Sequence, residues 1–171
     1  YRIFRDGEQR EDVEDIRDLW RKDSVAFLLG SSLSFDLALE RAGVPPSEEV
    51  WLFDTNRPTV PAGAFRGPLV VTMRLMSPAH AVIATQLTAR FVYTHGAPVH
   101  VGDPRDIGAD LTRPLLGRPL GRIPEGLTAV FWACGVTPQV AAREARPELM
   151  ITHSPGHGFI TDLAVDQFCL P

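Results

Sequence analysis

Cysteine is scarce in this sequence, and long apolar runs are absent from it. The two cysteines, Cys134 and Cys169, cannot form the disulfide framework of a small secreted domain, so they suit a reducing compartment. No apolar run approaches the roughly 20 residues that span a bilayer, and residues 1–6 lack the pattern of a signal peptide. We therefore expect a soluble, cytoplasmic chain that does not associate with membranes.

Clustered positive charge is also absent. The formal net charge is −4, and no run of lysine or arginine exceeds two residues. Binding to a phosphate backbone needs a concentrated basic face, so nucleic acid is excluded as a partner. The sequence contains no Gly-rich nucleotide fingerprint, Walker loop, serine-centred elbow or paired-carboxylate motif. We therefore expect no cofactor.

The residues that are present suffice for one substantial core. Hydrophobic residues make up 44% of the 171 positions, and at this length a single domain covering residues 1–171 is expected. The 14 glycines and 15 prolines exceed average usage, which predicts much ordered loop. The alternation of apolar runs with helical stretches predicts an α/β fold, a layered mixed sheet with flanking helices.

Two segments near the N-terminus carry different signals. Asp6 and Gly7 separate two short mixed segments, a pattern that indicates a hairpin at the edge of a sheet. The apolar run from Val25 to Leu29 is compatible with a buried strand or with a buried turn of helix. Its length does not decide between the two.

Residues 67–101 predict a β-α-β unit. Apolar and polar residues alternate over 69–75, Ser77 and Pro78 begin a helix, and residues 97–101 return as a strand. We expect this unit to form a small two-layer lobe within the domain. The stretch 108–126 shows no period, so it predicts a long ordered loop of a length typical of a lid or binding segment.

The chain is organised around residues 129–162. Two apolar runs, 128–133 and 149–152, flank a short helix that Thr137 and Pro138 begin. Successive strands joined through a helix pair in parallel by a right-handed crossover. We therefore expect both strands in the central sheet.

Cys134 lies where the first of these strands gives way to Gly135 and the helix. A helix N-terminus can lower the pKa of a thiol, and the N–H groups near Thr137 can bind an oxyanion. This favours a nucleophile or an acid. The alternative is a small buried hydrophobic residue, the usual role of a cysteine at the end of an apolar strand.

His153 and His157 lie on either side of Ser154-Pro155-Gly156, and Asp162 follows. Pro155 and Gly156 disfavour a helical metal-binding face, so we predict no metal site. The turn instead favours one imidazole as acid or base, with the other bonded to the scaffold. A purely structural pair is the third interpretation.

Other polar turns supply candidates for binding a small acid. Ser32 lies in a hydroxyl-rich helix start that suits a carboxylate or phosphate, or that simply caps the helix. Asn56 and Arg57 lie in a dense polar patch where the arginine fork can bind a carboxylate, or can be solvated. His95 and His100 flank a predicted strand. Together these turns predict one polar pocket.

The same segments resemble a known family. "FWACGVTPQ" followed by "ITHSPGHGFITD" is similar to the C-terminal signature of the DUF1445 (UPF0317) hydro-lyase family, to which a domain of mitochondrial D-glutamate cyclase is related. The likeness continues upstream in "LWRKDSVAFLLGSSLSFDLALERAGVP", "TNRPTVPAGAFRGPLVVTMR" and "HGAPVHVGDP". Ser31 and Thr59 stand where the family often has cysteine, and Gly158 where it often has methionine. Family members usually carry a further N-terminal segment.

The resemblance implies a hydro-lyase of amino-acid metabolism that cyclises D-glutamate to 5-oxo-D-proline and water. On this interpretation His157 or His153 carries the proton, and Cys134 is a further candidate catalytic residue. The residues expected to hold the substrate are Asn56, Arg57, Ser32, Thr137 and His95. A hydro-lyase acting on another small carboxylic acid, and a non-catalytic domain that binds a small acid or an oxoproline-metabolising enzyme, stay open. So does assembly as a homo-oligomer.

Overall fold

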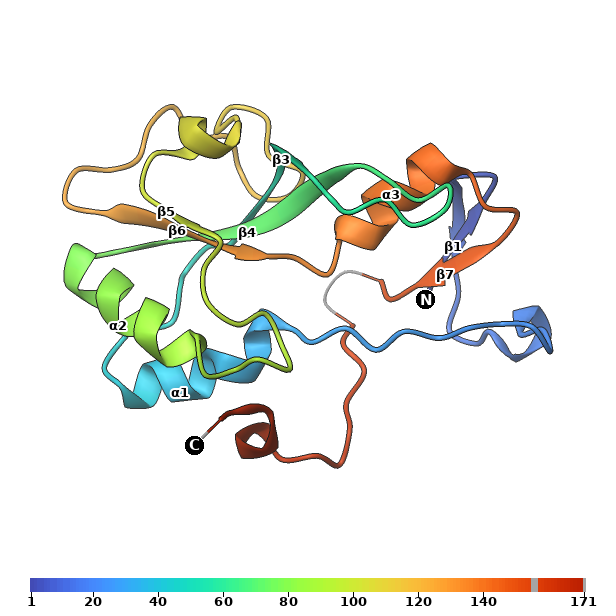
Figure 1. Cartoon of the computed structure of the whole chain (residues 1–171), viewed down its shortest axis with the longest axis horizontal. Helices are drawn as coiled ribbons and strands as arrows, with labels where there is room; N and C mark the ends of the chain where they lie inside the picture. The colour runs from blue at the N-terminus through green and yellow to red at the C-terminus, as the bar shows by residue number, and fades with distance from the viewer. Residues whose placement is uncertain (155–156, 171) are drawn as a thin grey trace.

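The structure is a computed structural model that describes residues 1–154 and 157–170. It contains two sheets (Figure 1). The larger has the strand order β3-β4-β6-β5 and the smaller has the order β2-β1-β7. The larger sheet consists of β3 (Trp51–Pro58), β4 (Pro68–Met76), β6 (Thr128–Ala133) and β5 (His100–Val101). The smaller consists of β1 (Arg2–Arg5), β2 (Glu8–Asp12) and β7 (Met150–Thr152).

The described residues also form three α-helices and four short 3-10 helices. The α-helices are α1 (Asp36–Arg41), α2 (Pro78–Thr88) and α3 (Thr137–Ala145). The 3-10 helices are η1 (Arg17–Leu19), η2 (Ser32–Phe35), η3 (Pro104–Ile107) and η4 (Val165–Phe168). The predicted α/β class is confirmed. No helix in the described part of the chain is long and apolar enough to cross a membrane.

The predicted parallel crossover between residues 128–133 and 149–152 is wrong. Both strands exist, as β6 and β7, but they belong to different sheets. β7 pairs antiparallel with β1, and β6 pairs antiparallel with β4 and β5. All described pairings are antiparallel, where the sequence predicted a mixed sheet. The N-terminal hairpin offers β7 an edge strand, so α3 links two sheets and does not return the chain to the first.

The hairpin that receives β7 forms as predicted. β1 and β2 pair antiparallel around Asp6 and Gly7, which both have positive φ, at 52° and 79°. This conformation matches the turn preferred in two-residue hairpins. The turn also packs against the end of α3: a Cβ at Gly7 would lie 2.9 Å from the Arg143 carbonyl oxygen. Glycine therefore serves both the turn and the docking of the small sheet.

The β-α-β segment over residues 67–101 is present as β4, α2 and β5. Ser77 caps α2 by accepting a hydrogen bond from the His80 N–H, as the Ser-Pro signal predicts. The two strands do not pair with each other, because β6 lies between them and pairs with both. Both strands of this segment therefore belong to the larger sheet.

Residues 25–29 form neither of the two buried elements that the sequence left open. The segment is extended and makes no regular secondary structure, and it runs from the N-terminal region toward η2 (Figure 1). Val25 is 75% exposed and Phe27 is 80% exposed. Local hydrophobicity predicted burial, but the described fold places no layer over this side of the segment.

The larger sheet has an apolar cluster on each face. On one face, α1 and α2 pack over β4 and β6 through Phe35, Leu39, Ala84, Phe91, Val130 and Trp132. On the other, η3 and the loop after it pack over the sheet through Trp51, Phe53, Val71, Met73, Ile107 and Phe131. The loop over 108–126 is irregular as predicted, and it is tied to β3 by hydrogen bonds between Leu52 and residues 115 and 116.

Candidate functional site

A buried arginine lies on the α1/α2 face of the larger sheet. Arg74 pairs across the strands with Val130, and Thr72 pairs with Trp132. Directly opposed residues in a sheet point to the same face, so Arg74 shares its face with Trp132. Cys134 directly follows the end of β6. Arg74 is only 5% exposed.

The guanidinium of Arg74 is held from three directions. Its Nη1 donates to Asp36 Oδ1 at 2.6 Å, and its Nη2 donates to Ser32 Oγ at 3.2 Å. The charge lies over the Phe35 and Trp132 rings, 5.4 Å and 5.7 Å from their centroids. Its Nε is buried and has no hydrogen-bond partner among the described atoms. An unpaired buried donor is unusual and suits a ligand or water.

His95 lies close enough to Arg74 for their charges to interact. Burial of the ring, and then the positive charge of Arg74, lower the pKa of His95 below its ordinary value. The neighbouring backbone explains this placement: a Cβ at Gly30 would lie 2.3 Å from the Thr94 Cα, so the turn before Ser32 packs against the turn before His95. We call Ser32, Asp36, Arg74 and His95 the Arg74 cluster. Because the pKa of His95 is lowered, its imidazole is in the base form at neutral pH.

Cys134 and Thr137 lie at the junction of β6 and α3. The Cys134 Sγ accepts from the Val136 N–H at 3.5 Å, and the Cys134 N–H donates to the Val70 carbonyl. The Thr137 hydroxyl accepts from the Val70 N–H at 3.0 Å. Thr137 therefore fixes α3 to β4, and its expected role in holding substrate stays a prediction.

His153 and Ser154 lie next to the small sheet. Ser154 donates to Asp12 Oδ2 at 3.1 Å, and desolvation followed by the charge of Arg2 lowers the pKa of His153. The His157 N–H donates to the Ser154 carbonyl. Pro155 and Gly156, on which the predicted turn depends, lie outside the described residues. Within the described ranges, no three His, Cys, Asp or Glu side chains could together hold a metal ion.

Asn56 and Arg57 line a pocket at a separate location. We call it the β3 pocket; its volume is about 450 Å³. Its described lining consists of Thr55, Asn56, Arg57, Pro58, Thr59, Pro61, Arg66, Gly67, Pro68 and Glu144. Ser32, His95 and Cys134 are not among these residues. The single pocket expected from the sequence is therefore divided between the Arg74 cluster and the β3 pocket.

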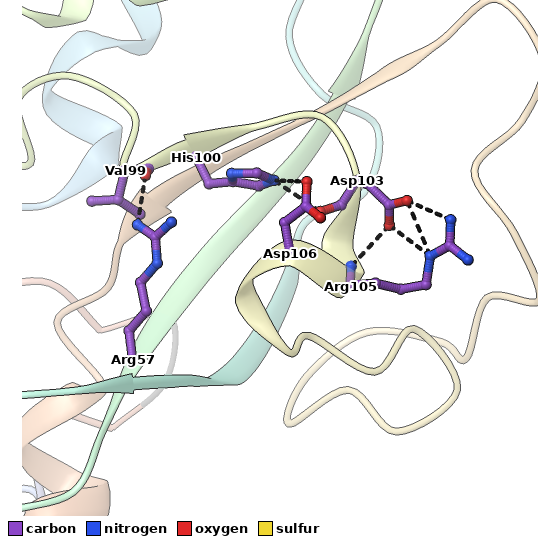
Figure 2. Close-up of polar contacts among 6 residues, drawn as sticks. All are labelled: Arg57, Val99, His100, Asp103, Arg105 and Asp106. Atoms are coloured by element: carbon purple, nitrogen blue, oxygen red, sulfur yellow. Dashed lines mark hydrogen bonds and ion pairs between the residues drawn. The ribbon is translucent and has the colours of Figure 1, made fainter.

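Arg57 extends from β3 toward the loop before β5 (Figure 2). Its Nη1 donates to the Val99 carbonyl at 3.0 Å. The adjacent His100 points away, and its Nε2–H donates to the Asp103 carbonyl at 2.8 Å. The Asp106 carboxylate lies 4.0 Å from the same nitrogen. Hydrogen bonds from the Arg105 side chain lower the pKa of Asp103 to about 2. His100 therefore anchors η3 to the sheet.

Sequence analysis missed Arg74 and Asp36. The signal for Arg74 was its place in the apolar strand "LVVTMRLM", where it shares an alternation with Thr72. An arginine is almost never fully buried unless it is paired, so a charge in such a strand indicates a buried partner or ligand. Asp36 carried no comparable signal, because an acid at the start of a helix is common.

Comparison with known proteins adds the family. Residues 25–162 match the family model described as D-glutamate cyclase. The chain is 53% identical to a "Putative hydro-lyase" of Stutzerimonas stutzeri, over 98% of this chain and 65% of the relative. It is 51% identical to a "Putative hydro-lyase" of Geobacillus kaustophilus, over 98% of this chain and 65% of that relative. It is 46% identical to one of Saccharopolyspora erythraea, over 100% of this chain and 69% of the relative. The chain thus spans about 65% of the length of the first two relatives.

Proposed function

The chain belongs to the D-glutamate cyclase family, and we propose that it contributes the substrate site of a hydro-lyase that cyclises D-glutamate to 5-oxo-D-proline and water. The observation that carries this proposal is the Arg74 cluster. It combines a buried guanidinium that has an unpaired N–H with a histidine in its base form. Catalytic sites are places where buried charges and perturbed pKa values gather, so this cluster is the better candidate of the two locations.

The reaction moves two protons. The α-ammonium loses one proton, and its nitrogen then attacks the γ-carboxyl carbon to give a tetrahedral oxyanion. The C–N bond forms and one C–O bond breaks. The departing oxygen leaves as water with two of the three ammonium protons, and the third stays on the ring nitrogen. The site must therefore hold a carboxylate, receive a proton from the amine, deliver protons to oxygen and stabilise the oxyanion.

The Arg74–Asp36 pair supplies complementary charges for an amino acid. The Asp36 side chain keeps 39% of its surface exposed, so it can accept a hydrogen bond from the substrate ammonium. Arg74 and the Ser32 hydroxyl supply donors for a carboxylate oxygen. Because Arg74 neutralises Asp36, the pair orients the ammonium without a large increase in its pKa.

His95 is proposed as the proton carrier. Since its pKa is lowered, the ring is neutral near pH 7 and can take the first ammonium proton. Cys134, directly after β6, is proposed as a proton donor or packing group. A covalent intermediate is not needed because the substrate's own amine attacks. The roles assigned from the sequence to His157 and His153 stay predictions, and the experiment below tests His157.

The test is turnover of D-glutamate, followed by chiral chromatography. We expect His95→Gln to reduce turnover by about a hundredfold, the usual scale of lost acid–base catalysis, and His80→Gln, on α2, to leave it unchanged. Cys134→Ser should reduce turnover less than His95→Gln. If His157→Ala abolishes turnover and His95→Gln does not, the proton carrier is His157. Binding of D-glutamate without turnover would support the non-catalytic alternative.

A further inference from the structure

The β3 pocket has the chemistry of a binding site but not of the proposed reaction. Its lining contributes two arginines, Arg57 and Arg66, the amide of Asn56 and the carboxylate of Glu144. Its described lining includes no histidine or cysteine, so a proton carrier of the kind proposed for the cyclisation is missing there. A pocket of about 450 Å³ nevertheless has the size of a small-molecule site.

The walls of the β3 pocket are fixed by its own hydroxyl groups. The Thr55 hydroxyl donates to the Leu69 carbonyl at 2.8 Å, and it accepts from the Arg57 N–H. The Thr59 hydroxyl donates to the Gly67 carbonyl at 2.9 Å. These bonds join the end of β3 to the start of β4. The hydroxyls are thus used for structure, while Arg57, Arg66 and Glu144 contribute charged residues to the lining.

The charges of the pocket fit one class of ligand. Two guanidinium groups match two carboxylates, and one carboxylate matches an ammonium. We propose that the β3 pocket is a second, non-catalytic binding site for a small amino dicarboxylate, and that Arg57 couples it to the Arg74 cluster. This inference goes beyond the proposed function and does not depend on turnover.

The coupling follows from the loop between His95 and His100. One end of this loop lies at the Arg74 cluster through His95, because Thr94 packs directly against Gly30 in the turn before Ser32. Its other end is held to β6, because the Val99 N–H donates to the Phe131 carbonyl and the His100 ring lies 5.6 Å from the Phe131 ring. The Val99 carbonyl accepts from Arg57 (Figure 2). A ligand carboxylate that draws the Arg57 fork into the pocket removes this bond, and the change reaches His95 through the loop.

The first test locates binding by NMR, using D-glutamate as the probe on the 171-residue chain. We expect amide shifts at residues 55–57, 59, 66 and 144 that saturate with an affinity of their own. Arg57→Ala and Arg66→Ala should each weaken binding at these amides by about tenfold or more, the effect of losing a charged hydrogen-bond donor. Arg113→Ala, an exposed arginine outside the pocket, should not. Absence of these shifts in the parent chain, or their persistence in the double Arg57/Arg66 variant, would overturn the proposal.

Two further measurements test the ligand class and the coupling. Glutarate, which lacks the ammonium, should bind the pocket more weakly than D-glutamate, and Glu144→Gln should remove this preference. Without ligand, Arg57→Ala should shift the His95 ring resonance, whereas Arg66→Ala should leave it in place. An unchanged His95 resonance in Arg57→Ala would refute the coupling. Failure of the proposed function would appear separately, as missing turnover and missing shifts around Ser32.

Discussion

In the Arg74–Asp36 pair, we expect replacement of the more exposed residue to cost more stability than replacement of the buried one. Arg74 has 6% of its side chain exposed and Asp36 has 39%. Removal of Asp36 leaves a guanidinium buried without a countercharge, whereas removal of Arg74 leaves a carboxylate that water can reach. We therefore expect Asp36→Asn to destabilise the fold more than Arg74→Met, although Asp36 is the more exposed partner.

The magnitudes follow from the two environments. Breaking a buried pair so that a charge is stranded costs about 3–5 kcal/mol, and the amide introduced by Asp36→Asn retains an acceptor, so we expect a loss of about 3 kcal/mol for this variant. Arg74→Met loses the ion pair and the contacts with Phe35 and Trp132, which are worth about 1–2 kcal/mol where desolvated. It also removes the unpaired Nε, an offset of about 1 kcal/mol or more. The difference gives an expected net loss of about 0–1 kcal/mol for Arg74→Met.

Urea unfolding followed by tryptophan fluorescence measures both values, and Trp132 lies beside the pair. The double variant should resemble Arg74→Met, because the stranded charge is then gone. A larger loss for Arg74→Met than for Asp36→Asn would refute this reasoning. Such a result would mean that the stacking of the guanidinium on the two rings, and not the countercharge, dominates its stabilisation.

Three other predictions test neighbouring features. Because the pKa of His95 is lowered in the fold, the unfolded chain binds a proton at this imidazole more readily than the folded chain does. The free energy of unfolding should therefore fall as the pH decreases below about 6.5. His95→Gln should reduce this pH dependence, as measured by denaturation at several pH values. Phe27→Ser should change the free energy of unfolding by no more than about 0.5 kcal/mol, because the ring is 80% exposed; a loss of several kcal/mol would contradict this. Gly30→Ala would place a Cβ 2.3 Å from the Thr94 Cα, so it should lower Tm and shift the His95 resonance. Gly121→Ala, with no atom within 4 Å, is its control, and equal Tm values would refute the packing argument.

Local signals in the sequence predicted several elements correctly. The turn at Asp6 and Gly7, the helix start at Ser77 and the strand over 128–133 each depend on backbone preferences or on a short apolar pattern. Such preferences act between residues a few positions apart, so they can be read without the fold. The resemblance of several motifs to those of a known family likewise indicated the family, which the match over residues 25–162 confirms.

The candidate site was predictable only in part. Ser32 and His95 were named from their turns, and the structure places both at Arg74. Asn56 and Arg57 were assigned to the same pocket, but they line another one. Sequence patterns indicate that a turn is polar, yet they do not determine which turns meet. That depends on contacts between distant parts of the chain, such as the one between Gly30 and Thr94.

The sequence by itself determined the local elements and the family, whereas the tertiary structure decided which strands pair and which charges are buried. β7 pairs with β1 because an edge strand from the far end of the chain is available to it. The apolar run at 25–29 stays exposed because no described layer covers it, although its composition predicted burial. Arg74 is buried because Asp36, Ser32 and two aromatic rings surround it. Each outcome depends on long-range pairing and desolvation, which are properties of the assembled chain and not of any short segment.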